Sequence, residues 1–149
     1  MLLIVIVLGM VSLRPGEDDS AKLRNEARRL AMLLQTAQEE AILLGQTIAV
    51  TIEPKSYYFS VLEDGKYEPP ENEHLGPRPL PEGMKFSSVI IEGVTETEEA
   101  PRLLVPSTGE VAPFTFILKL GEHRWRLEGE FGGEIKSSEP EPEKAWRHV

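Results

Sequence analysis

Apolar and polar positions divide the chain into an uncharged apolar start, a long helical stretch and a region of alternating positions. Between Glu17 and Gly45, apolar residues recur at alternating spacings of four and three, which places them along one face of an α-helix. This stripe consists of Leu23, Ala27, Leu30, Leu34, Ala37, Ala41 and Leu44. We therefore predict an amphipathic helix that ends at Gly45 and packs the stripe on its own domain. For the N-terminal half of the helix, contact with neighbouring subunits is the alternative.

After Gly45 the period of the apolar positions changes to two, which predicts an antiparallel sheet. The expected strands are Thr47 to Ile52, Tyr57 to Leu62, Lys85 to Glu92, Arg102 to Val105, Phe114 to Leu120 and His123 to Glu130. Asp64-Gly65 and Gly121-Glu122 are expected to form tight turns. Along the strand that precedes the second turn, alternation places Phe114, Phe116, Leu118 and Leu120 on one face.

Three stretches lack a strand or helix pattern. The five prolines between Pro69 and Pro81 predict a surface loop rather than a strand, and Thr95 to Pro101 is expected to be an acidic loop. Residues 137–149 are rich in Glu and Pro and poor in apolar residues, so this tail is expected to be disordered. The predicted organisation is an apolar helix over 1–16, one α+β domain over 17–136 and the tail over 137–149.

The first thirteen residues form an uncharged run that is apolar enough for a membrane. As a helix they span roughly 20 Å, whereas a bilayer core is about 30 Å thick. The segment is therefore expected either to insert with help or to begin further upstream in the native chain. A cleaved signal peptide and a buried core helix are the alternatives, but no basic residue precedes the run and no Ala-x-Ala follows it. The predicted membrane and assembly helix comprises Leu2, Leu3, Ile4, Val5, Ile6, Val7, Leu8, Val11 and Leu13.

Composition narrows the function classes. The 149 residues, 40% of them hydrophobic, suffice for one domain with a modest core. The net charge of −9 argues against nucleic acid as a partner, because phosphate binding relies on clustered Lys and Arg. The chain has no cysteine, which excludes disulfides, thiolate metal sites and thiolate nucleophiles.

Candidate catalytic and metal-binding groups are sparse. His74, His123 and His148 lack the short spacings of metal pairs and are interpreted as surface residues. Glu128 and Glu130 share a strand face and could pair as in glycosidases, but a solvated face is the preferred interpretation. The acidic clusters 17–19 and 96–99 lack the ligand spacing of a calcium loop. No phosphate loop or serine elbow is present, so we predict no enzyme activity, no catalytic residue, no metal and no cofactor.

The order of features resembles that of the type IV pilin-like superfamily: an apolar helix, a proline at its junction, an amphipathic continuation and a small antiparallel domain. The finer resemblance is to the minor pseudopilin H family of type II secretion. It is carried by Glu26-Ala27-Arg28-Arg29-Leu30-Ala31, Ala37-Gln38-Glu39-Glu40-Ala41-Ile42, Leu62-Glu63-Asp64-Gly65-Lys66, Leu80-Pro81-Glu82-Gly83, Val105-Pro106-Ser107-Thr108-Gly109-Glu110, Leu127-Glu128-Gly129-Glu130 and Gly133-Glu134-Ile135. The resemblance implies an α+β, pilin-like fold in which a long N-terminal helix packs on a small antiparallel sheet.

The resemblance also implies a structural role. Similar proteins are single-pass inner-membrane proteins with a periplasmic domain, and they assemble at or near the tip of a short pseudopilus that aids export of folded proteins. The implied partners are the minor pseudopilins I, J and K, the major pseudopilin, the inner membrane and secreted proteins, with no nucleic acid. Members of the family begin with a basic leader, a Gly, a methylated Phe and a Glu, none of which precedes Leu2-Leu3-Ile4 here. We therefore expect a leader and about five further residues to precede this sequence natively, which would bring the helix close to the required span of about 20 residues.

Two alternatives stay open. One is a minor pilin of a type IV pilus, acting in assembly or in DNA uptake. The other is a membrane-tethered periplasmic enzyme or binding domain, which would need a concave site with convergent polar groups.

Overall fold

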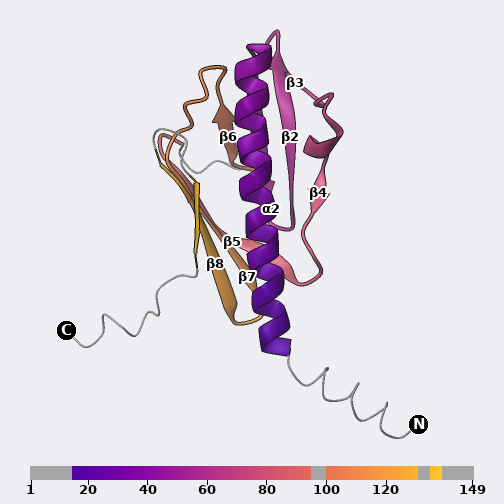
Figure 1. Cartoon of the computed structure of the whole chain (residues 1–149), viewed down its shortest axis with the longest axis vertical. Helices are drawn as coiled ribbons and strands as arrows, with labels where there is room; N and C mark the ends of the chain where they lie inside the picture. The colour runs from indigo at the N-terminus through magenta and orange to yellow at the C-terminus, as the bar shows by residue number, and fades with distance from the viewer. Residues whose placement is uncertain (1–14, 95–99, 131–134, 139–149) are drawn as a thin grey trace, which may run out of the picture.

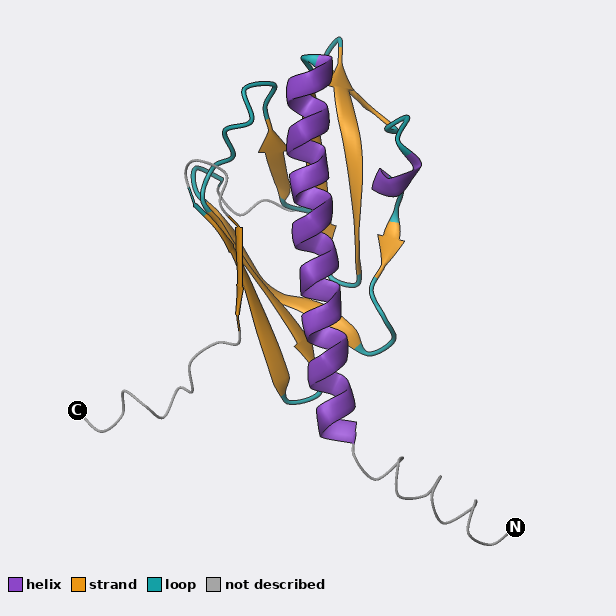
Figure 2. Ribbon diagram, viewed as in Figure 1, coloured by secondary structure: helices purple, strands orange, loops and turns teal. Residues whose placement is uncertain are grey.

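One long helix lies across two antiparallel sheets (Figure 1). The computed structural model describes residues 15–94, 100–130 and 135–138. Helix α2 (Pro15–Leu44) runs the length of the molecule in front of both sheets (Figure 2). The predicted α+β class is confirmed, with the single expected sheet divided into two.

The first sheet has the strand order β3-β2-β1-β6, and β4 pairs separately with β2. Its strands are β1 (Thr47–Glu53), β2 (Ser56–Glu63), β3 (Lys66–Glu68), β4 (Arg78–Pro79) and β6 (Arg102–Val105). A short 3-10 turn, η1 (Glu73–Leu75), lies between β3 and β4. The second sheet has the order β5-β7-β8-β9 and comprises β5 (Met84–Ile91), β7 (Phe114–Leu120), β8 (His123–Gly129) and β9 (Ile135–Ser138).

The predicted turns are confirmed by backbone geometry. Gly45 follows the last residue of α2 with a φ of 64°. Asp64 and Gly65 both have positive φ and connect Glu63 to its register partner Lys66, as a two-residue hairpin with a primed turn requires. Gly121 has a φ of 63° in the hairpin between β7 and β8.

The core lies between α2 and the inner faces of the sheets. Six of the seven stripe residues are buried: Leu23, Ala27, Leu30, Leu34, Ala37 and Ala41. The four residues predicted to share a face of β7 are buried as well. Edge-to-face ring contacts link Tyr57 to Phe86 and Phe86 to Phe116, so the core joins the two sheets directly.

The predicted packing stripe is wrong at its last residue, Leu44. Its side chain is 55% exposed, because the chain turns away at Gly45 into β1 and no strand covers the final residue of the helix. The side chain instead lines an open groove beside β2.

The sequence analysis did not predict three of the strands, β3, β4 and β9. The predicted proline-rich loop was wrong at β4, Arg78–Pro79, which pairs with Tyr57 and Ser56 of β2. Pro79 is tolerated because β4 is a short strand at a sheet edge, where a missing backbone donor costs little. Another strand that was not predicted is β3, which follows the Asp64-Gly65 turn and pairs with β2.

The predicted disordered tail was wrong at its first two residues. Ser137 and Ser138 belong to β9 and pair with Leu127 and Arg126 of β8, and the Trp125 indole donates to Ser137 Oγ. The folded part thus extends past the predicted boundary at residue 136. The remainder of the predicted tail, 139–149, lies outside the described residues.

The predicted membrane and assembly helix, from Leu2 to Leu13, lies outside the described residues as well. Within residues 15–94, 100–130 and 135–138, no helix has the length and hydropathy that a bilayer crossing requires.

Gly129 is a core position that has no room for a side chain. It faces Phe114 across the β7–β8 ladder. A Cβ atom there would overlap Cε1 of the Phe114 ring and lie 2.7 Å from Cδ1 and Cζ. The ring cannot move freely, because it is buried and packs on Phe116 at a centroid distance of 4.5 Å.

We expect Gly129→Ala to lower the free energy of unfolding by about 1–3 kcal/mol through overpacking. Thermal denaturation of the variant and the parent chain measures the effect. The double variant Gly129→Ala/Phe114→Leu removes the clashing ring atoms, so it should lose less stability than the two single changes added together. Strict additivity would show that the predicted clash is not the cause.

Candidate partner-binding surface

The histidines form no catalytic or metal-binding group among the described residues. His74 is exposed, as predicted. His123 is half-buried, with Nδ1 3.3 Å from Ser20 Oγ, so it links the β7–β8 hairpin to the start of α2. His148 lies outside the described residues.

Three of the acidic residues considered as catalytic or metal-binding candidates are engaged in ion pairs, and the acidic cluster 96–99 lies outside the described residues. Glu128 Oε1 lies 3.5 Å from Arg126 Nη1, and Glu130 Oε1 lies 3.7 Å from Lys136 Nζ. Asp18 pairs with Lys22 on the first turns of α2 at 3.4 Å. Within the described ranges, no three His, Asp or Glu side chains converge on a position for a metal ion.

A buried polar contact connects α2 to β2. The Tyr57 hydroxyl donates a hydrogen bond to Glu26 Oε2 at 3.3 Å, and Glu26 is only 3% exposed. Arg29 lies 3.8 Å from the other carboxylate oxygen. Burial, reinforced by the negative charge of Glu26, raises the pKa of Tyr57 far above its ordinary value. The contact orients the helix on the sheet. Sequence patterns could not indicate it, because the two residues are 31 positions apart.

We expect Tyr57→Phe to lower the free energy of unfolding by about 1–2 kcal/mol at neutral pH, since the buried Glu26 loses a donor. The raised pKa means that the folded state holds the Tyr57 proton more tightly than the unfolded state. This stabilisation is fully present below about pH 10 and is lost as the pH rises beyond it.

Denaturant titrations at pH 7 and pH 11 test this expectation. The difference in stability between the parent chain and Tyr57→Phe should shrink at the higher pH. Tyr67→Phe is the matched control, because Tyr67 is exposed and its ring contact with Arg102 does not need the hydroxyl. If both variants behave alike, the Glu26 contact contributes nothing to stability.

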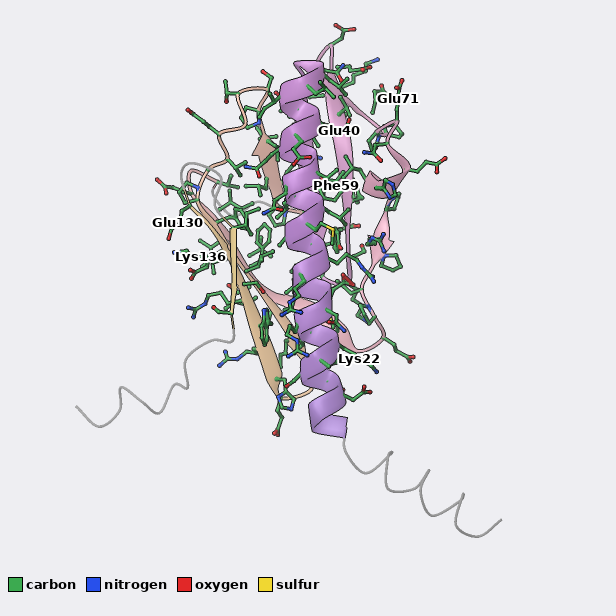
Figure 3. All side chains as sticks on the ribbon, in the orientation of Figure 1. Lys22, Glu40, Phe59, Glu71, Glu130 and Lys136 are labelled. Carbon is green, nitrogen blue, oxygen red and sulfur yellow. The ribbon has the colours of Figure 1, made fainter. Side chains whose placement is uncertain are left out.

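An open groove of about 640 Å³ lies at the C-terminal end of α2. Its lining comes from α2, the turn after α2, β1, β2, the segment between β3 and η1, and η1 itself. The lining residues are Glu40, Leu44, Gln46, Ile48, Val61, Glu63, Pro69, Pro70, Glu71, Asn72 and Leu75. Figure 3 shows Glu40 on the helix and Glu71 on the neighbouring loop at the same end of the molecule. Leu44 in the groove wall is 55% exposed, and Leu43, which precedes it in α2, is 80% exposed.

Amide side chains hold two of the groove carboxylates. Asn72 Nδ2 donates to Glu40 Oε1 at 3.1 Å, which ties the proline-rich segment to the helix. Gln46 Nε2 donates to Glu63 Oε1 at 3.0 Å. The groove is therefore a defined surface feature, with acidic and apolar walls.

The GspH family model, described as type II transport protein GspH, matches residues 26–133. This range covers most of α2 and every strand described except β9. The chain belongs to the GspH family.

Solved structures agree with this family. The minor pseudopilin EpsH from the type 2 secretion system of Vibrio cholerae is 25% identical, with a TM-score of 0.69 over 82% of this chain and 96% of that one. Escherichia coli GspH, at 15% identity and a TM-score of 0.62, covers 83% and 94% of the two chains. The Pseudomonas aeruginosa type IV minor pilin FimU shares the fold: it is 20% identical, with a TM-score of 0.57 over 81% of this chain and 90% of that one. No curated protein sequence matches the chain significantly.

The family assignment made from sequence fragments is confirmed. One of those fragments shows why such residues matter to the GspH fold: in Val105 to Glu110, Gly109 adopts a φ of 83° and its carbonyl oxygen accepts a hydrogen bond from Gln38. The fragment thus secures the connection after β6 to α2. The predicted role of minor pseudopilin in type II secretion is supported by the family match and by EpsH, while FimU at its lower identity supports only the shared fold.

Proposed function

We propose that this GspH-family chain is a structural subunit at or near the tip of the pseudopilus, where it aids export of folded proteins across the outer membrane. The observation that carries the proposal is the family match over residues 26–133. The likeness to the V. cholerae minor pseudopilin over most of both chains supports it.

The apolar residues 2–13 serve as both membrane anchor and assembly element in this proposal. Such a helix can leave lipid only by packing against equivalent helices of other subunits, which offer comparable apolar surroundings. The chain would be held in the inner membrane with residues 17–138 as a periplasmic domain. Its neighbours would be the minor pseudopilins I, J and K and the major pseudopilin, and N-terminal methylation would follow leader cleavage.

Two experiments test the proposal. Deletion of the gene in the native host should abolish secretion of folded proteins without loss of viability, and the chain should restore it. Loss of twitching or transformation with intact secretion would overturn the proposal in favour of a type IV pilus.

The mature N-terminus provides the second test. Intact mass spectrometry and terminal peptide sequencing of the protein from native membranes test the start of the mature chain. We expect an N-methylated Phe, a Glu four residues later and then the sequence Leu2-Leu3-Ile4. A start beyond Leu13 in the membrane-derived protein would contradict the anchor and assembly role.

A further inference from the structure

We propose that the groove at the C-terminal end of α2 binds Lys and Arg side chains from the helix of a neighbouring pilin-type subunit. The inference rests on the proposed function, because it takes its partner from the same assembly. It identifies which surface of this chain makes the contact and the chemistry that the contact requires.

The lining of the groove matches both parts of a long cationic side chain. Ile48, Val61 and Leu75 provide buried apolar surface at the groove, and Leu44 adds an exposed apolar wall. Lys and Arg pack their aliphatic stems on surfaces of this kind while the charged head reaches for a polar partner. Carboxylates that could receive such a head border the same space.

Those carboxylates lack a cationic partner within the described part of the chain. Glu40 and Glu63 accept hydrogen bonds from neutral amides only. Glu71 is exposed and makes no ion pair with any described residue. No Lys, Arg or His lines the groove. Three carboxylates around one apolar space therefore favour a cation supplied from outside the chain.

The C-terminal end of α2 also favours a positive charge in the groove. The last turn of α2 contains no basic residue, although the C-terminal end of a helix dipole favours positive charge. A guanidinium or ammonium group placed in the groove beside Glu40 would complement both the carboxylates and the nearby helix terminus.

Helix α2 of this chain is an example of a helix surface with cations that could bind to such a groove on a neighbouring subunit. Its exposed cations, Lys22, Arg24, Arg28 and Arg29, all lie in the N-terminal half, and no Lys or Arg follows Arg29 in α2. Lys22 lies far along the helix from Glu40 (Figure 3). In a pilin-type subunit of this design, Lys22 pairs with Asp18 and Arg29 pairs with Glu26. After the acidic first turn at 17–19, Arg24 and Arg28 therefore carry the positive charge of the first half of the helix, while Glu39 and Glu40 carry negative charge near its end. Stacking two such subunits in the same direction brings opposite charges together in a heterologous contact.

Photo-cross-linking in native membranes tests the proposal. p-Benzoylphenylalanine is placed at Leu44 in the groove wall of the full chain, and at Ile90, an equally exposed apolar residue on β5, as the control. We expect an adduct at position 44 that maps to a Lys- or Arg-bearing peptide from the first half of another pilin-type helix. Its yield should be at least tenfold above that of the same adduct from position 90.

Charge reversal provides the second arm. Glu63→Lys/Glu71→Lys should reduce the yield from position 44 about tenfold. Glu92→Lys/Glu122→Lys changes the net charge equally at exposed sites outside the groove and should leave the yield unchanged. Matching melting temperatures establish that both variants are folded.

The outcomes separate this inference from the proposed function. Adducts only with lipid or exported proteins, equal yields from the two positions, or equal effects of the two charge reversals would each overturn the groove proposal. Secretion measured in the same cells reports on the proposed function. Intact, chain-dependent secretion without the expected adduct rejects the groove alone, whereas secretion that survives deletion of the chain rejects the proposed function.

Discussion

Leu30→Ala is expected to lower the free energy of unfolding by about 2–5 kcal/mol, the range for truncating a fully buried leucine. Leu30 is 0% exposed at the middle of the stripe that packs α2 on the sheets. Removing its side chain takes apolar surface out of the core and leaves a cavity, because the long helix is held on both sides of this position and cannot collapse into the space.

Met32→Ala is the matched control for this prediction. Met32 lies two residues further along the same helix and is 61% exposed, so its truncation should change stability by no more than about 0.5 kcal/mol. Denaturant titration followed by circular dichroism measures both variants. Equal losses would mean that the inner face of α2 does not contribute more to stability than its outer face.

Ile6→Lys is expected to abolish secretion through loss of membrane insertion. A lysine in the middle of the apolar segment costs about 3 kcal/mol for insertion, which corresponds to a change of roughly 100-fold in the insertion equilibrium. The assembled state should suffer too, because a buried ammonium would face apolar helices of neighbouring subunits.

A deletion strain complemented with each variant tests this expectation, with secreted protein and membrane-bound chain measured together. Ile6→Leu keeps the segment apolar and should secrete at the parental level. Normal insertion and secretion by Ile6→Lys would refute the proposal that residues 2–13 form the membrane and assembly helix.

Much of the fold could be predicted because it depends on local chemistry. The stripe from Leu23 to Ala41 follows from helical spacing, and it is buried as expected. The Asp64-Gly65 hairpin follows from the preference of these residues for positive φ. β6 and β7 have the predicted bounds, and buried positions alternate with less buried ones along both strands.

The errors fall where pairing overrode local preference. Arg78–Pro79 and Ile135–Ser138 have weak strand patterns, yet each lies along an existing strand whose backbone groups need partners. Leu44 fits the helical spacing and is nevertheless exposed, because spacing alone does not determine where the sheet beneath a helix ends.

The sequence by itself determined the class of the protein: a long helix, an antiparallel domain, a chain without cysteines and a set of family fragments whose order identifies GspH. Only the tertiary structure decided which side chains meet. The Glu26–Tyr57 contact, the Gly129–Phe114 packing and the groove bordered by Glu40, Glu63 and Glu71 each join residues from separate elements. Periodicity and turn preferences act over a few residues, whereas these contacts form only when the sheets fold against the helix.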